Sequence, residues 1–100
     1  MNLIDTKTRN INNKRVYEEI DEFMMEVFAT LNIYWANTEH RDQLVDMCDM
    51  WMEQFALESG KIIQYDIRCT YPSNDRAIFS LSYRQRNCYN TSVIEYTFEV

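Results

Sequence analysis

The side chains with the clearest chemical potential are four carboxylates, spaced so that they share one face of a helix. They follow one another at intervals of four, three and four residues: Asp42, Asp46, Asp49 and Glu53. Four carboxylates in a row can hold a hard cation. The segment lacks the turns, the backbone carbonyl ligands and the glycine of a calcium-binding loop. It therefore favours an acidic face that meets solvent or a partner, and we predict no metal site.

Nucleophiles and bases are sparse in the rest of the chain. His40 is the only histidine, and the three cysteines, Cys48, Cys69 and Cys88, have no metal-binding or redox spacing. Cys48 and Cys69 fall on apolar faces, where we expect core residues. Because no nucleophile stands beside a base, the sequence predicts no catalytic residues, no cofactor and no enzymatic activity.

Composition limits the classes of partner. A formal charge of −6 argues against a nucleic-acid-binding surface, although arginines and tyrosines are interleaved in the second half of the chain. No segment has the length and hydropathy of a transmembrane helix, so we expect no membrane partner. An odd number of cysteines without a signal peptide is typical of reduced thiols in a cytosolic or virion protein.

Two segments have the periodicity of amphipathic helices. Over residues 14–34, apolar side chains recur every three or four positions: Val16, Ile20, Phe23, Val27, Leu31 and Tyr34. A second helix is predicted after a capping residue at Asn37 or Thr38. Its apolar stripe is Leu44, Cys48, Trp51 and Phe55. Gly60, the only glycine, suits the left-handed position that ends a helix.

After Gly60 the apolar period changes to two, which predicts strands. The alternating sets are Ile63, Tyr65, Ile67 and Cys69; Phe79, Leu81 and Tyr83; and Ile94, Tyr96, Phe98 and Val100. A loop is predicted at residues 71–75 and a reversal at residues 85–92. We therefore predict an α+β fold, a two-layer sandwich of two helices on a small three-stranded, mainly antiparallel sheet. This single domain spans residues 14–100.

Residues 1–13 are predicted to form an extended arm. Its apolar residues are Leu3, Ile4 and Ile11, and its charges include Lys7 and Arg9. The formal charge is +3 over residues 1–15 and −10 over residues 16–60, so the arm of one copy could dock on the helices of another. A solvated acidic face is the alternative. The last strand leaves an open sheet edge near Ile94, Tyr96 and Phe98, where a neighbour's strand could add.

The order of these features resembles the C-terminal domain of contractile-tail sheath proteins from bacteriophages and related injection machines. The resemblance is carried by short motifs over residues 11–100: Arg15-Val16-Tyr17, Trp35-Ala36-Asn37, Arg41, Gly60, Tyr65-Asp66-Ile67-Arg68-Cys69 and Asn74. This chain is far shorter than such proteins, has Arg84-Gln85-Arg86-Asn87 where they carry Lys-Pro, and stops at its closing strand.

The resemblance implies a structural virion protein, assembled in the host cytoplasm, whose copies form a ring or tube with six-fold symmetry by lending arms to neighbouring sheets. The tail tube and other virion proteins are further expected partners. A neck, collar, baseplate or head-decoration protein would use the same edges. An acidic phage-encoded inhibitor or adaptor of a host protein is the alternative of a different class.

Overall fold

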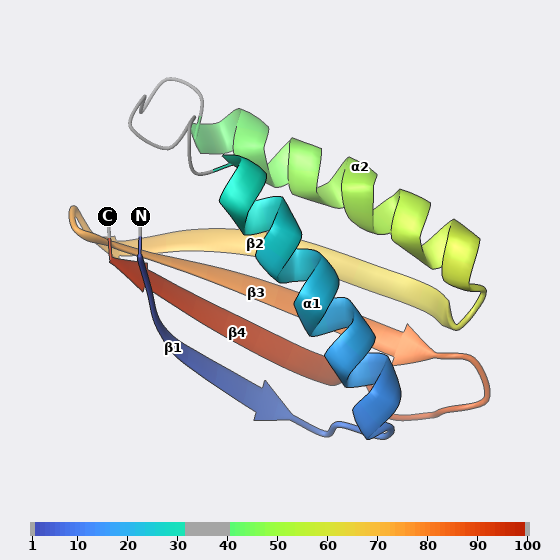
Figure 1. The fold of residues 1–100 in the computed structure, drawn as a ribbon. Helices are drawn as coiled ribbons and strands as arrows, with labels where there is room; N and C mark the ends of the chain where they lie inside the picture. The colour runs from blue at the N-terminus through green and yellow to red at the C-terminus, as the bar shows by residue number, and fades with distance from the viewer. Residues whose placement is uncertain (1, 32–40, 100) are drawn as a thin grey trace.

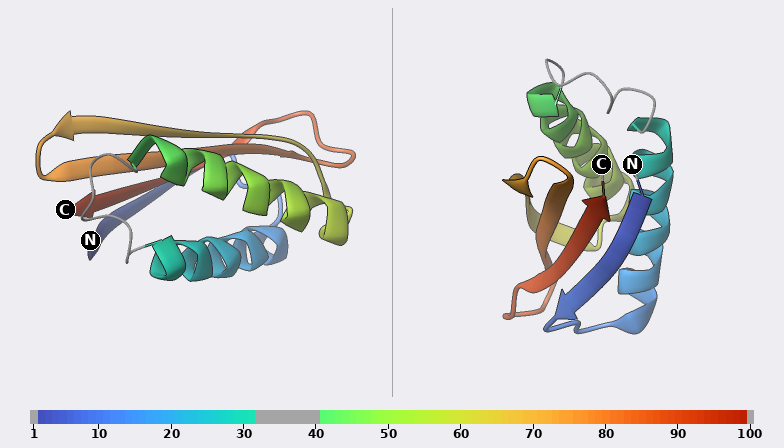
Figure 2. Two further views of the ribbon diagram at one scale, coloured as in Figure 1. Left: turned by 90° about the horizontal axis from the view of Figure 1, so that it is seen from above. Right: turned by 90° about the vertical axis from the view of Figure 1, so that its left-hand side faces the viewer.

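The computed structural model describes residues 2–31 and 41–99. The elements, in chain order, are β1 (Asn2–Arg9), α1 (Lys14–Leu31), α2 (Arg41–Ser59), β2 (Ile62–Ser73), β3 (Arg76–Gln85) and β4 (Ser92–Glu99). The strands form one antiparallel sheet in the order β1-β4-β3-β2. Both helices lie on the same face of this sheet (Figures 1 and 2). The α+β class is confirmed, whereas the predicted number of three strands is wrong.

The fourth strand is β1, which comes from the segment predicted to be an arm. It pairs with β4 of the same chain, with Leu3 opposite Phe98, Thr6 opposite Tyr96 and Thr8 opposite Ile94. Ile94, Tyr96 and Phe98 therefore lie on an inner strand and not at an open sheet edge. β1 escaped prediction because all eight of its side chains are exposed, so it has no alternating apolar pattern.

Helix α1 begins directly after Asn13, whose side chain satisfies a free backbone amide of the first turn. The Asn13 side-chain oxygen accepts a hydrogen bond from the Val16 amide at 3.1 Å, which is the arrangement of an N-terminal cap. Met24 and Phe28 join the predicted apolar stripe as buried residues, whereas Phe23 is only partly buried. The predicted continuation to Tyr34 and the predicted caps at Asn37 and Thr38 lie outside the described residues.

Helix α2 ends as predicted, at Gly60. This residue has a φ of +65°, and its amide donates to the Ala56 carbonyl at 3.1 Å. A glycine carries no Cβ and adopts this left-handed conformation at little cost. The chain then turns directly into β2, so Gly60 sets how the C-terminal end of α2 lies against the start of that strand.

The core lies between the helices and the inner strands β3 and β4. The Phe28 ring of α1 packs against the rings of Phe79, Tyr96 and Phe98, at centroid distances of 5.2, 5.1 and 4.7 Å. A ring contact of 4.8 Å between Phe23 and Phe55 joins the two helices. Aromatic pairs of this kind stabilise a core beyond the burial of their area.

The predictions for the two cysteines on apolar faces and for the loop between β2 and β3 are confirmed in part. Cys48 is buried as predicted, whereas Cys69 is only half-buried. The loop predicted at residues 71–75 is shorter, because β2 continues to Ser73 with an irregularity in register between Thr70 and Ser73. The reversal itself needs only Asn74 and Asp75.

Candidate functional site

The residues predicted to form the inter-subunit arm are divided by the structure into two groups. Leu3 and Ile4 are 39% and 47% exposed on β1, and the Lys7 ammonium lies 3.9 Å from the Asp5 carboxylate. Ile11, by contrast, packs against the buried core. Lys7 is opposite Glu95 and Arg9 is opposite Val93, on the sheet face turned away from the helices. Within one chain, the basic arm therefore does not meet the acidic helices.

What attaches β1 to the sheet is mainly its backbone. Besides the ladder with β4, the buried Ser92 hydroxyl donates to the Asn10 carbonyl at 2.7 Å. The Asn12 side chain donates to the Asn90 carbonyl at 3.4 Å. Asn10 itself has a φ of +56°, a conformation that asparagine tolerates better than most residues. The connection from β1 to α1 is thus a short turn that is pinned at Asn10.

The predicted acidic face is partly retained as a surface of α2. Asp49 and Glu53 line a cleft between α2 and β2, whereas Asp46 lies elsewhere along the same helix. The side chain of Asp42 lies outside the described residues. No group of three or more potential metal ligands occurs among the side chains that the structure describes.

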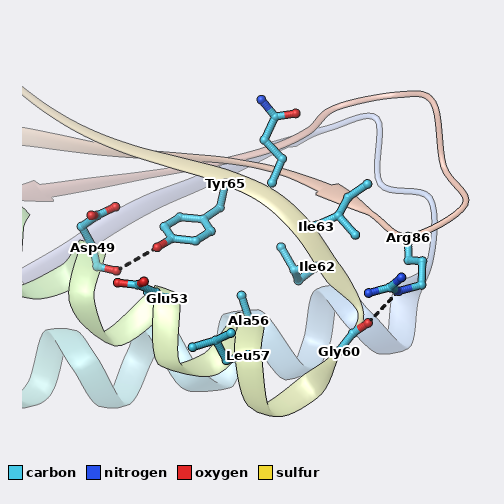
Figure 3. A pocket seen from close by; sticks show the side chains of 10 residues that line it. Asp49, Glu53, Ala56, Leu57, Gly60, Ile62, Ile63, Tyr65 and Arg86 are labelled. Atoms are coloured by element: carbon cyan, nitrogen blue, oxygen red, sulfur yellow. Dashed lines mark hydrogen bonds between the residues drawn. The ribbon is translucent and has the colours of Figure 1, made fainter.

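The cleft is an open space of about 630 Å³ at the C-terminal end of α2 (Figure 3). Asp49, Glu53, Ala56 and Leu57 form the helical wall, and residues at the start of β2 form the opposite wall. The complete lining is Asp49, Glu53, Ala56, Leu57, Gly60, Ile62, Ile63, Gln64, Tyr65 and Arg86. Helix and strand face each other here because the turn at Gly60 folds one back along the other.

The two ends of the cleft differ in charge. Near one end, the Tyr65 hydroxyl donates to the Asp49 backbone carbonyl at 3.4 Å. Partial burial raises the pKa of Tyr65, and the nearby carboxylates of Asp49 and Glu53, which make this end of the cleft acidic, raise it further. At the other end, the Arg86 side chain donates to the Gly60 carbonyl at 3.1 Å, and the Arg86 amide donates to the Lys61 carbonyl at 2.9 Å.

The cleft also runs beside a free sheet edge. Of the strands in the described residues, β2 pairs with β3 alone, and its register shifts between Ile62 and Gln64. Ile63 is 45% exposed there, and Leu57 on the helical wall is 73% exposed. Two large aliphatic side chains therefore stand in water next to unpaired strand backbone, which is a combination that favours contact with another polypeptide.

Sequence reasoning identified Asp49 and Glu53 but missed Leu57, Ile63 and Arg86. A signal for Leu57 exists, because it lies outside the apolar stripe of its helix, as Met50 does at 67% exposure. Leu57 and Met50 are seven residues apart and so lie on one side of α2. The predicted position of Ile63 on one face with Tyr65 and Ile67 is wrong, because the register shift between Ile62 and Gln64 leaves Ile63 exposed and buries Ile62 instead. Arg86 lies in the predicted reversal at residues 85–92, where nothing in the sequence singles it out.

The strongly perturbed ionisable groups lie in the core and not in the cleft. Burial raises the pKa of the Cys48 thiol to about 12, which leaves it protonated and a poor nucleophile. Burial and the nearby Asp21 also raise the pKa of Tyr96, whose hydroxyl donates to an Asp21 carboxylate oxygen at 2.9 Å. These contacts stabilise the packing of α1 on the sheet and leave both groups out of reach of a substrate.

Comparison with protein-family models, curated proteins and solved structures finds no match for this chain. Of the helices in the described ranges, none combines the length and the hydropathy that crossing a bilayer requires. The candidate site is therefore defined by geometry alone. It consists of the two outer strands of the sheet, β1, which pairs with β4, and β2, which lies beside an acidic and aliphatic cleft.

Proposed function

We propose that this protein is a structural virion subunit, similar to a minimal contractile-tail sheath subunit, whose copies assemble by exchanging β1. The observation that carries this proposal is the way β1 is attached. It fills the edge of an inner strand yet buries none of its own side chains. No side chain of β1 is therefore held in a buried site, and its ladder of backbone hydrogen bonds is one that the β4 of another copy offers equally well.

β1 can pair with the β4 of its own chain or with the β4 of another copy. The difference in free energy between these two arrangements is small for a second reason. A strand moved to an identical neighbour makes the same ladder, and it keeps the pairing of Lys7 with Glu95. Only the turn at residues 10–13 has to open. Exchange of an identical element is a low-cost route to an oligomer, and a chain of such exchanges produces the ring or tube that the resemblance to sheath proteins implies.

Exchange can be detected with pairs of chains that each carry one new cysteine. We would mix a Lys7→Cys chain with a Glu95→Cys chain, both with Cys69→Ser and Cys88→Ser and with the buried Cys48 retained. A short thiol-reactive crosslinker should join the two chains, because positions 7 and 95 face each other in the ladder. Neither chain carries a cysteine at both positions, so a crosslink between positions 7 and 95 can only join two chains and reports exchange directly.

The matched control replaces Lys7→Cys by Glu22→Cys, which puts an exposed thiol on α1 away from β4. Mixed dimers in both pairings, or in neither, would contradict strand exchange.

Electron microscopy of the purified chain across salt concentrations tests the assembly itself. Tubes or stacked six-fold rings would support a sheath-like subunit, and deletion of residues 1–9 should abolish them while the remaining domain stays folded. A persistent monomer would count against the proposal.

A further inference from the structure

We infer that the cleft between α2 and β2 is a docking site for an extended segment of a partner protein. The segment would add as a strand along the free edge of β2. It would present a basic, an aliphatic and an acidic side chain to the cleft. This site is separate from the β1–β4 edge, so it goes beyond the assembly proposed above.

The first support is the unpaired backbone of β2. In the part of the chain that the structure describes, this strand pairs in the sheet with β3 alone, so the outer amide and carbonyl groups of residues 62–65 are open to a partner. An extended peptide can satisfy them by main-chain hydrogen bonds, with side-chain pockets giving selectivity. The cleft supplies such a pocket along residues 62–65 of the edge.

The second support is the aliphatic middle of the cleft. Leu57 from α2 and Ile63 from β2 both line the cleft, and Figure 3 shows Ile63 on the side of β2 turned away from Leu57. Leu57, at 73% exposure, loses water contact when an aliphatic side chain enters the cleft beside it, and Ile63, at 45% exposure, does so when the bound segment covers its side of the strand. A strand bound at this edge therefore needs one aliphatic residue that points toward α2.

The third support is charge. The ion pairs among the described residues include none of Asp49, Glu53 and Arg86, so these three charges are available to a ligand. Asp49 and Glu53 suit a basic side chain, and the remaining guanidinium nitrogens of Arg86 suit a carboxylate. Alternate side chains of an extended segment face α2, which places the basic, aliphatic and acidic residues two positions apart.

The chain's own arm is not the occupant. β1 pairs with β4 inside one chain, and in an exchanged assembly it would pair with the β4 of a neighbour. Either way it lies at the opposite edge of the sheet from β2. The acidic wall of the cleft instead selects a different polypeptide whose exposed segment carries a positive charge.

The test uses the full-length protein and the peptide acetyl-Thr-Lys-Thr-Val-Thr-Glu-Thr-amide. Two control peptides replace its Lys by Glu or its Val by Thr. Binding is followed through the backbone amide NMR signals of the protein. We expect a Kd below about 1 mM, as suits a short unconstrained peptide, with the largest shifts at Leu57, Ile63 and Gln64. Each control peptide should bind at least about tenfold more weakly, because it removes one complementary group.

Protein variants locate the site. Glu53→Lys should weaken binding of the Lys peptide about tenfold and strengthen binding of the Glu control peptide. Glu58→Lys makes the same charge change on the same helix outside the cleft, and it should alter neither Kd by more than about twofold, because rim charges contribute little. Equal effects of the two variants would overturn the proposal, as would shifts confined to the opposite sheet face.

Two further results would also overturn it. One is the absence of any shift at 1 mM peptide. The other is a concentration-dependent shift of the cleft signals without peptide, which would assign the cleft to a second copy of the chain. Neither result bears on the crosslinking of positions 7 and 95, so failure here and failure of strand exchange are distinguishable.

Discussion

The inner strands of the sheet, β3 and β4, bury far more side chains than the outer strands, β1 and β2. In β3 and β4 every second side chain is buried, including Phe79, Tyr83, Ile94 and Tyr96. β1 buries no side chain, and β2 fully buries only Ile62 and Ile67. Stability therefore comes from the centre of the sheet. The two edges are left polar, irregular in register and accessible, which is what a protein needs if it joins partners through strand backbone.

The largest expected difference between centre and edge is in the cost of side-chain truncation. Phe79→Ala should lower the free energy of unfolding by about 3–5 kcal/mol, because Phe79 is 1% exposed and packs against Phe28 and Phe98. Leu3→Ala on β1 should cost less than about 1 kcal/mol, as half-exposed residues do. Urea denaturation of both variants measures this. Similar costs would break the comparison, since β1 would then share in the core.

Alkaline pH should lower the free energy of unfolding through ionisable groups in the buried centre of the molecule rather than on its surface. Burial raises the pKa of Cys48 from 9.0 to about 12, so above pH 9 the unfolded chain releases a proton that the folded chain retains. The contribution of Cys48 to the free energy of unfolding is thus fully present below pH 9. It is lost between pH 9 and 12, by up to about 1.4 kcal/mol per pH unit. Tyr96 adds to the decline above its ordinary value of 10.0, because its pKa is raised as well.

Tyr96→Phe separates the contribution of Tyr96 to the alkaline loss of stability from that of Cys48. At neutral pH it should cost about 1–3 kcal/mol, because it removes the hydrogen bond to the Asp21 carboxylate. Above pH 10 it should flatten the decline, which would confirm that the buried hydroxyl contributes to it. Tyr89→Phe is the matched control, since that side chain is 97% exposed. A steeper decline in the Tyr96→Phe variant would contradict the assignment.

A smaller effect than that of core truncation is expected at the entry to β2. Gly60→Ala should cost about 1 kcal/mol, since a φ of +65° disfavours any residue with a Cβ. No atom lies within 4 Å of the added Cβ, so the cost is conformational and not steric. Gly60→Asn should recover part of it, because asparagine tolerates this conformation. Thermal unfolding of the two variants checks the order, and a larger loss for Asn than for Ala would refute a purely conformational cost.

The parts of the fold that follow from side-chain pattern were predictable from the sequence. Ile94, Tyr96 and Phe98 alternate with polar residues, and Val16, Ile20 and Val27 recur at helical spacing, because each set has to leave water together. Gly60 was predictable as a helix end because few residues besides glycine adopt its conformation readily. These features are local in sequence and need no knowledge of distant partners.

The parts that depend on backbone pairing or on distant residues were not predictable in the same way. β1 is held by a ladder that any sequence can form, so its exposed side chains gave no sign that it completes the sheet. The cleft depends on the turn at Gly60, which brings Leu57 of α2 and residues 62–65 of β2 to one opening, and neither pattern alone indicates this. The acidic residues Asp49 and Glu53 were recognised, but their position beside a free strand edge requires the tertiary structure.

The pairing of β1 with β4 also has a consequence for how the protein is made. Of the elements that the structure describes, the ribosome produces β1 first and its partner β4 last, and the contact of Ser92 with Asn10 spans 82 residues. At synthesis rates of about 5–20 residues per second, roughly 4–16 s pass between the two strands. During this interval β1 of a growing chain has no β4 of its own. On a crowded polysome, the finished β4 of a neighbouring chain could reach it first, so exchange would be set by the timing of translation before any folded monomer exists.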